Sequence, residues 1–376
     1  HARLRGGRRV GVGTVNGTGS QSANNILFKA LFRMGIGVCA KNLFPSNIQG
    51  LPTWFQIRAS HRGWQNLREK DDILVCLNPD TALPDIKEMG PNTAIFYNAD
   101  LIQVPETLKQ PGQAYYAIPI EKLAAKVDDP KLRPLLKNLF YVGTLAVLYG
   151  IDVDVLESVI RDTFRDKSNA IAANLKALHI GLDWAKANVV KQDDFRFEAV
   201  PGGNDGKVHF EGNEACAWGA LYGGCTFLAW YPITPSSSLA ENLESYFSKP
   251  RRDADGRRRY AVVQAEDELA AMGMVVGAAW AGARAMTTTS GPGISLMQEF
   301  LGLGYYAEIP SVVVDVQRVG PSTGLPTRTQ QSDVLAAAQA SHGDTRHPVL
   351  FPATPNEAFE LTRQAFDLAD RFQTPV

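Results

Sequence analysis

Apolar and polar positions alternate along the first hundred residues in the manner of an α/β domain. The segment 8–15 has the pattern of a short strand, and a turn-forming cluster at 16–22 leads into an amphipathic helical pattern at 23–33. The runs 72–77 and 93–97 are continuously apolar, which is typical of parallel strands that are covered on both faces. We therefore expect an α/β layer here.

A helical period replaces this alternation between residues 121 and 190. Apolar residues recur there every three to four positions in several successive segments. Gly150 is expected to end one of these helices, because glycine is favoured just after a helix. Asp152 or Asp154 is expected to cap the next helix.

The segment 191–211 is charged and has no clear period. We therefore expect a first domain, an α/β domain with a helical extension, over residues 1–195. A linker is expected over 196–212. A second domain is expected over 213–376, and we expect it to continue past residue 376, because a further strand pattern begins at Thr374.

Strands and helices alternate again in the second domain, which predicts a doubly wound parallel sheet. Ligands of such sheets bind outside the carboxyl ends of the strands. The expected strands are 226–233, 260–265, 284–289 and 310–317, and the expected helices begin near residues 214, 235, 268, 294 and 356.

Composition and charge exclude several classes of protein. Of the 376 residues, 45% are hydrophobic and 20% are charged, which is typical of a globular chain and not of a disordered or fibrous one. The formal net charge of -1 provides no overall field for nucleic acid or an anionic membrane. The longest uncharged apolar stretch, 269–283, is too short for a membrane span, and the first residues lack a signal-peptide pattern. We expect a cytoplasmic protein with no nucleic-acid or membrane partner.

The cysteines are dispersed and form no C-x-x-C pair, which disfavours an iron–sulfur or zinc site built by this chain alone. Buried, reduced thiols of a cytosolic protein are the expected interpretation. The cysteines are Cys39, Cys76, Cys216 and Cys225.

Two loops that follow predicted strands carry candidate chemistry. In Tyr231-Pro-Ile-Thr-Pro-Ser-Ser237, Thr234 is predicted as the N-cap and Pro235 as the first helical residue. Such a helix start can hold a carboxylate or phosphate, or it can serve capping alone. In Gln264-Ala-Glu-Asp-Glu268, the helix dipole alone favours acids, and a partly buried Glu268 that acts as a proton partner is the functional alternative.

Two further loops have the same position after a strand. Ser290-Gly-Pro-Gly293 is a predicted turn whose backbone can approach a ligand. In Gln317-Arg-Val-Gly-Pro-Ser-Thr-Gly324, Arg318 can pair bidentately with a carboxylate, although a solvated arginine at a strand end is as common.

These four motifs have the order and spacing seen in the alpha subunit of 2-oxoacid:ferredoxin oxidoreductases, which depend on thiamine diphosphate. The whole chain resembles the type in which a gamma domain precedes the pyrimidine-binding domain, and it is most similar to 2-oxoglutarate:ferredoxin oxidoreductase. The resemblance implies oxidative decarboxylation of a 2-oxo acid to an acyl-coenzyme A with electrons passed to ferredoxin, or the reverse carboxylation. It also implies a heterodimer, or a dimer of heterodimers, with a beta subunit.

The resemblance assigns a role to individual positions. Glu268 matches the glutamate that hydrogen-bonds N1′ of the aminopyrimidine, Thr234 the threonine that meets the substrate carboxylate and 2-oxo group, and Arg318 the arginine that anchors that carboxylate. The other matching positions are Pro232, Ile233, Ser290 and Gly291 for thiamine diphosphate, and Gly17, Gly19 and Ser20 for coenzyme A.

One departure from thiamine enzymes concerns the metal. Their Gly-Asp-Gly magnesium segment has no counterpart here, because Gly203-Asn-Asp-Gly206 lies in the predicted linker. We assign no metal ligand to this chain. The resemblance implies that the diphosphate, Mg²⁺ and a [4Fe-4S] cluster lie in the beta subunit, without which this chain is expected to be inactive.

Two alternatives stay open. The first is a sister specificity for pyruvate, branched-chain 2-oxo acids or indolepyruvate, since no visible residue identifies a partner for a second substrate carboxylate. The second is a non-catalytic nucleotide-binding module, which only the glycine loop after Val15 supports.

Overall fold

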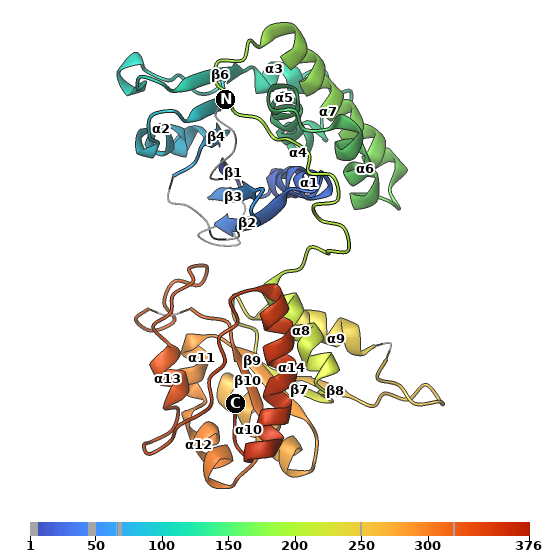
Figure 1. Cartoon of the computed structure of the whole chain (residues 1–376), viewed down its shortest axis with the longest axis vertical. Helices are drawn as coiled ribbons and strands as arrows, with labels where there is room; N and C mark the ends of the chain where they lie inside the picture. The colour runs from blue at the N-terminus through green and yellow to red at the C-terminus, as the bar shows by residue number, and fades with distance from the viewer. Residues whose placement is uncertain (1–6, 44–49, 65, 67–69, 249, 319) are drawn as a thin grey trace. The chain divides into compact units, whose positions relative to one another are not determined.

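The computed structural model describes residues 7–43, 50–64, 66, 70–248, 250–318 and 320–376. The chain divides into two compact units, His1–Val208 and His209–Val376 (Figure 1). Each unit has its own sheet and its own hydrophobic core.

The first unit contains a six-stranded mixed sheet. Its strands are β1 (Arg8–Val15), β2 (Gly37–Leu43), β3 (Pro52–Ser60), β4 (Ile73–Cys76), β5 (Ala94–Asn98) and β6 (Ala114–Ile118). The strand order is β2-β3-β1-β4-β5-β6. The strands β1, β4, β5 and β6 are parallel, whereas β3 is antiparallel to both β1 and β2. The predicted strands correspond to β1, β4 and β5.

Helices cover both faces of this sheet. They are α1 (Ser20–Arg33), α2 (Pro79–Glu88), η1 (Glu106–Leu108), α3 (Ile120–Ala124), α4 (Arg133–Leu136), α5 (Asn138–Tyr149), α6 (Val153–Thr163) and α7 (Ser168–Asn188). Side chains alternate along a strand, so Ile73 and Val75 pack into the core that contains residues of α1 and α5, whereas Leu74 and Cys76 pack against α2. This two-sided cover explains why β4 is apolar throughout.

Two helix ends in the helical extension lie where the sequence predicts them. Gly150 ends α5 in the left-handed conformation, with a φ of 71°. The Asp152 side chain caps α6, because its Oδ1 accepts hydrogen bonds from the backbone N–H groups of Asp154 at 2.9 Å and Val155 at 3.3 Å. Both predictions are confirmed, and Asp152 is the capping residue.

The segment after α7 packs against the first unit for part of its length. The rings of Phe195 and Phe197 lie 6.5 and 6.2 Å from the Tyr149 ring, centroid to centroid. The Val200 N–H donates to the Met34 carbonyl at 2.8 Å. The two units therefore divide within the segment 196–212, but the beginning of that segment is not a free linker, because the Phe197 side chain is buried and Val200 is hydrogen-bonded to the first unit.

The second unit contains a four-stranded parallel sheet. Its strands are β7 (Phe227–Trp230), β8 (Ala261–Gln264), β9 (Ala285–Thr289) and β10 (Val312–Asp315). Their order is β10-β9-β7-β8, so the chain steps from β7 to β8 on one side and then returns to β9 on the other. The strand order reverses between β7 and β9, which is where open α/β sheets bind ligands. Beside β10, Val376 exchanges backbone hydrogen bonds with Ser311 and Val313, both at 2.9 Å.

The helices of this unit are α8 (Gly212–Tyr222), α9 (Ser237–Phe247), α10 (Glu268–Trp280), α11 (Gly291–Leu296), α12 (Gln298–Tyr306), α13 (Val334–Ala338) and α14 (Pro355–Phe372). One core joins α8, α9 and α14 to the sheet, and a second core joins α10 and α12 to its other face. The predicted doubly wound fold is therefore confirmed. Within the described ranges, no helix combines the length and the apolar character that a bilayer crossing requires.

Candidate functional site

All four candidate loops of the second unit lie at one edge of its sheet. The strands β7, β8, β9 and β10 are parallel neighbours, so their carboxyl ends share that edge. The loops after these strands carry, in chain order, Thr234, Glu268, Ser290 and Arg318. The topology therefore gathers residues that are up to 84 positions apart in the sequence.

Glu268 is the first residue of α10, and its side chain is buried. The preceding residue, Asp267, caps the helix by accepting a hydrogen bond from the Ala270 N–H at 2.6 Å. Both Glu266 and Asp267 are exposed, whereas Glu268 is only 6% exposed. Burying a carboxyl group costs free energy unless it is paired or hydrogen-bonded, so buried acids are often functional. Of the three acids in this loop, Glu268 is therefore the candidate for a functional site.

A close approach of α11 encloses Glu268. A Cβ atom on Gly293 would lie 1.9 Å from Thr289 Oγ1 and 2.8 Å from Glu268 Cγ. Only glycine fits between these two side chains. The predicted turn at 290–293 is wrong in this respect, because Ser290 is the N-cap and Gly291 already begins α11. A proline is tolerated in a first helical turn, so Pro292 does not interrupt the helix.

Ser290 and Gly291, two of the predicted cofactor-binding positions, are both buried at this edge. The Ser290 hydroxyl donates a hydrogen bond to the Val316 carbonyl at 2.9 Å. That bond ties the end of β9 to the segment after β10. In the structure, Ser290 therefore has a structural partner of its own.

Arg318 connects two of the loops. Its side chain is buried, and its Nη1 donates to the Thr234 carbonyl at 2.8 Å. Its Nε donates to the Thr323 carbonyl at 3.0 Å, and Nη2 also bonds that oxygen. Burial lowers the pKa of the guanidinium, and the negative charge of nearby Glu268 acts in the opposite direction. The structure thus brings Glu268, Thr234 and Arg318 together.

The helix after β7 begins later than predicted, so its N-cap residue is not Thr234. The helix α9 begins at Ser237 and Ser236 is its N-cap residue, so Thr234 does not cap it. The reason is the Ile233 carbonyl, which accepts the N–H groups of Ser236 at 2.8 Å and Ser237 at 3.2 Å and forms a turn before the helix. Pro232 is exposed and Ile233 is half-buried.

A hydroxyl pair that the sequence did not single out spans the point where the strand order reverses. Ser236 Oγ and Thr288 Oγ1 are 3.1 Å apart, and both residues are fully buried. The consecutive threonines of β9 are a sequence signal for Thr288. Which residue lies opposite Thr288, however, depends on the order of the strands in the sheet. Asp333, which accepts from the Arg318 backbone N–H at 3.2 Å, lies in a loop without a local signal.

The first unit presents a second candidate region, around the glycine loop after β1. Gly17 and Gly19 both have left-handed backbone conformations, with φ values of 85° and 73°. A Cβ atom on Gly19 would lie 2.5 Å from the Leu135 carbonyl oxygen. Chain packing therefore requires glycine at position 19. Ser20 is buried and begins α1.

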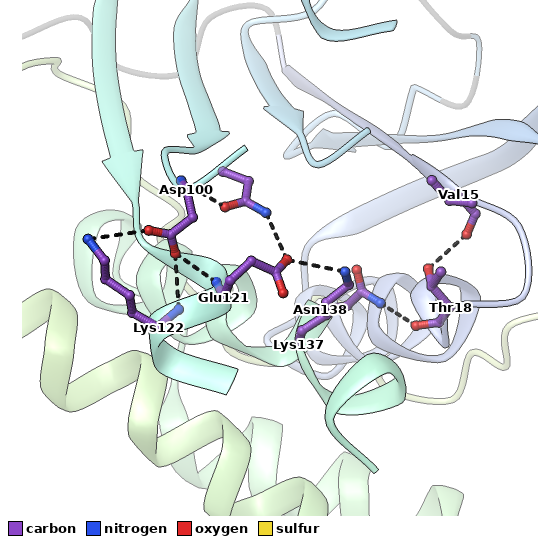
Figure 2. Close-up of polar contacts among 8 residues, drawn as sticks. Val15, Thr18, Asp100, Glu121, Lys122, Lys137 and Asn138 are labelled. Carbon is purple, nitrogen blue, oxygen red and sulfur yellow. Dashed lines mark hydrogen bonds and ion pairs between the residues drawn. The ribbon is translucent and has the colours of Figure 1, made fainter. Parts of the chain in front are cut away.

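Polar contacts hold this loop against the beginning of α5. Figure 2 shows Thr18 between two partners, since its Oγ1 donates to the Val15 carbonyl at 2.7 Å and its own carbonyl accepts from Asn138 Nδ2 at 2.6 Å. Next to Asn138, Lys137 lies 3.3 Å from Glu121 (Figure 2). A cavity of about 250 Å³ adjoins these residues and is lined by Glu121, Ala124, Ala125, Arg133, Pro134 and Lys137.

The segment Gly203–Gly206, rejected above as a metal site, packs against α1. Asn204 Nδ2 donates to the carbonyls of Phe32 at 2.8 Å and Ile36 at 2.9 Å. In the part of the chain that the structure describes, no three His, Cys, Asp or Glu side chains gather in a way that could hold a metal ion.

Two family models match the chain, one in each unit. The model described as "Pyruvate ferredoxin/flavodoxin oxidoreductase" matches residues 9–184. The model described as "Pyruvate flavodoxin/ferredoxin oxidoreductase, thiamine diP-bdg" matches residues 218–376, which include all four candidate loops of the second unit.

Curated relatives agree with both models. The chain is 32% identical over 408 residues to 2-oxoacid:ferredoxin oxidoreductase 2, subunit alpha, of Aeropyrum pernix, covering 97% of this chain and 63% of that subunit. It is 48% identical over 166 residues to the 2-oxoglutarate synthase subunit KorA of Methanothermobacter thermautotrophicus, covering 44% of this chain and 42% of that subunit. The chain thus spans less than two thirds of the length of either relative.

A solved structure has the same fold. The 2-oxoglutarate:ferredoxin oxidoreductase of Magnetococcus marinus, determined with 2-oxoglutarate, coenzyme A and succinyl-CoA bound, matches with a TM-score of 0.88 and 33% identity. The match covers 98% of this chain and 62% of that one. The resemblance inferred from the four motifs is therefore confirmed.

Proposed function

Because this chain is homologous over nearly its whole length to 2-oxoacid:ferredoxin oxidoreductase alpha subunits, we propose that it is the alpha subunit of a thiamine-diphosphate-dependent 2-oxoglutarate:ferredoxin oxidoreductase. Together with a beta subunit, it converts 2-oxoglutarate and coenzyme A to succinyl-coenzyme A and CO₂ and passes the electrons to ferredoxin, or it catalyses the reverse carboxylation. The observation that carries the proposal is the buried Glu268 beside Arg318, at the carboxyl edge of a parallel sheet.

The surroundings of Glu268 fit an aminopyrimidine ring. Gly293 leaves the Glu268 side chain room beside α11, and the carboxyl group is withdrawn from bulk water. When bound, thiamine diphosphate supplies the nucleophilic carbon that attacks a 2-oxo group and takes up the electrons left by decarboxylation. In this role Glu268 holds a proton at N1′ of the ring, and Pro232, Ile233, Ser290 and Gly291 line the cofactor.

Arg318 and Thr234 suit the substrate end. A guanidinium has five N–H groups, and the contacts of Arg318 with the Thr234 and Thr323 carbonyls use three of them. Two N–H groups are therefore free for the 1-carboxylate of a 2-oxo acid. We propose that Arg318 anchors that carboxylate and that the Thr234 hydroxyl meets the carboxylate and the 2-oxo group.

We propose that the coenzyme A region lies at the Gly17, Gly19 and Ser20 loop of the first unit. The support is the start of the 14-residue helix α1, which has no side-chain cap, and the cationic Arg133 and Lys137 beside the adjoining cavity. In the Magnetococcus structure, coenzyme A is bound to a protein of the same fold.

The remaining parts of the enzyme belong to partners in this proposal. A beta subunit holds Mg²⁺, the diphosphate end of the cofactor and the [4Fe-4S] cluster, and ferredoxin accepts electrons through the complex. The names of the relatives as subunits support a partner chain. The four free cysteines suit the reducing cytoplasm, where we propose that the enzyme works.

The test is the full-length alpha subunit, co-expressed with its own beta subunit and supplied with thiamine diphosphate and Mg²⁺. We expect reduction of ferredoxin, or of a viologen dye, that requires both 2-oxoglutarate and coenzyme A. Pyruvate, branched-chain 2-oxo acids and indolepyruvate serve as comparison substrates, and a preference for one of them would replace 2-oxoglutarate. A complex that binds no thiamine diphosphate and uses no 2-oxo acid would refute the proposal.

Replacing Arg318 with alanine is expected to raise the KM for the 2-oxo acid about 10- to 100-fold. Charge-assisted hydrogen bonds contribute about 1.5–3 kcal/mol each, and 1.4 kcal/mol corresponds to a factor of ten. The Arg318→Lys variant keeps the positive charge but loses the planar, forked guanidinium group. Its KM for the 2-oxo acid should therefore lie between that of the wild type and that of Arg318→Ala. Steady-state kinetics measure both effects, with the KM for coenzyme A as the internal control. An unchanged KM for the 2-oxo acid in Arg318→Ala would remove Arg318 from substrate binding.

A further inference from the structure

A buried carboxylate outside the four motifs holds the backbone at Arg318. Asp333 is only 2% exposed and is the N-cap residue of α13, yet its side chain makes no cap hydrogen bond with that helix. Instead, Oδ1 accepts a hydrogen bond from Gln317 Nε2 at 2.8 Å, and Oδ2 accepts one from the Arg318 N–H at 3.2 Å. Asp333 therefore closes the loop of 15 residues that begins at Arg318.

A second carboxyl group adjoins Asp333. Asp315 is the last residue of β10, and its Oδ1 is buried without a hydrogen-bond partner among the described residues. Burial, followed by the charge of Asp333 and a hydrogen bond with Asp333, raises the pKa of Asp315 to about 8. Because its carboxylate would be poorly solvated and would lie beside the charge of Asp333, Asp315 keeps its proton to a higher pH than an ordinary aspartate.

We propose that Asp333 is a positioning residue that orients Arg318 for the 2-oxo acid carboxylate, and that the neighbouring Asp315 supports Asp333 in this role. The inference rests on the proposed function, which makes Arg318 the substrate anchor. The geometry behind it is the pair of hydrogen bonds that the buried Asp333 accepts from Gln317 and from the Arg318 backbone, together with Asp315 Oδ1 at the end of β10, which is buried without a partner among the described residues. Neither aspartate touches the substrate in this scheme.

The surroundings of Asp315 determine how the pair responds to pH. Asp333 faces it from the beginning of α13, Arg318 follows it on the same chain segment, and His347 and Cys216 line the cavity that Asp315 also lines. The His347 Nε2 is within 2.7 Å of the Ala340 carbonyl. When the pH rises through about 8, Asp315 loses its proton and a second negative charge appears beside Asp333. We therefore expect the KM for the 2-oxo acid to rise in this range.

The test compares two isosteric changes in the full alpha–beta complex. Asp333→Asn loses one of two acceptor oxygens, so the KM for the 2-oxo acid should rise about tenfold, while kcat and the KM for coenzyme A stay within about twofold. Asp315→Asn resembles the protonated acid, so it should behave like wild type at pH 7 and should lack the rise in KM above pH 8. Asp344→Asn, which changes an exposed aspartate in the loop after α13, is the matched control.

A second measurement reports on the position of Arg318 without activity. Arg318 is buried in the wild type, so trypsin should cut slowly after it, and Asp333→Asn should accelerate this cut at least fivefold while other sites stay unchanged. An unchanged rate of cutting, or equal harm from Asp315→Asn and Asp333→Asn, would overturn the inference. If Arg318→Ala also leaves the KM unchanged, the proposed substrate role of Arg318 fails instead, whatever the proteolysis shows.

Discussion

Replacing Glu268 with glutamine should lower the turnover of the reconstituted complex by about two to four orders of magnitude, the usual contribution of a positioned acid or base. Glutamine keeps the size of the side chain and its place at the beginning of α10, but it cannot hold and release a proton at a ring nitrogen. The measurement is the 2-oxo acid-dependent reduction of ferredoxin at saturating cofactor. Assembly with the beta subunit should be unchanged, since the two side chains have nearly the same shape.

The matched control for this variant is Glu266→Gln. Glu266 belongs to the same loop and carries the same charge, but it is exposed, so its replacement should leave turnover within about twofold. Equal activity of both variants and the wild type would remove Glu268 from the mechanism. Equal loss in both would mean that the net charge of the loop matters, and not the buried carboxyl group.

The second large effect is expected from Gly293→Ala. The new methyl group would lie 1.9 Å from Thr289 Oγ1 and 2.8 Å from Glu268 Cγ, so α11 or the Glu268 side chain must move. Overpacking of this kind typically costs about 1–3 kcal/mol of unfolding free energy. We expect a lower melting temperature together with a loss of turnover that approaches that of Glu268→Gln, because misplaced catalytic groups lose rate steeply.

The control for Gly293→Ala is Gly277→Ala. Gly277 lies within α10, and a Cβ atom there would meet no other atom within 4 Å. Alanine is favoured over glycine inside a helix by about 1 kcal/mol, so this variant should be at least as stable as the wild type. Thermal unfolding of both variants makes the comparison. A Gly293→Ala protein with wild-type stability and turnover would show that the close approach of α11 is unimportant.

Sequence predicts β9 of the second unit well because this strand is buried on both faces. The strand β9 is apolar or hydroxyl-bearing throughout and every residue in it is buried, so its pattern is unambiguous. The antiparallel strands β2 and β3 of the first unit were not predicted. Most of β2 is only half-buried and it contains Lys41 and Asn42, so neither a continuous apolar run nor a clean alternation marks it.

The residues of the candidate site divide in the same way. Glu268 could be identified from the sequence because it directly follows a strand and begins a helix, which is a local pattern. The N-cap of α9 was predicted at Thr234, two residues before the observed Ser236, because the turn formed by the Ile233 carbonyl precedes the helix. Asp333 was beyond sequence reasoning, because its partners lie 15 and 16 positions away across an irregular loop.

The packing of Phe197 and Val200 against the first unit determines where the two units can be separated in the laboratory. A recombinant fragment that stops at residue 195 would lose the Phe197 ring beside Tyr149 and the N–H that pairs with the Met34 carbonyl. It would expose apolar surface and should therefore aggregate on expression. A fragment extended to Val208 keeps these contacts, so that residue is the better end point for isolating the first unit.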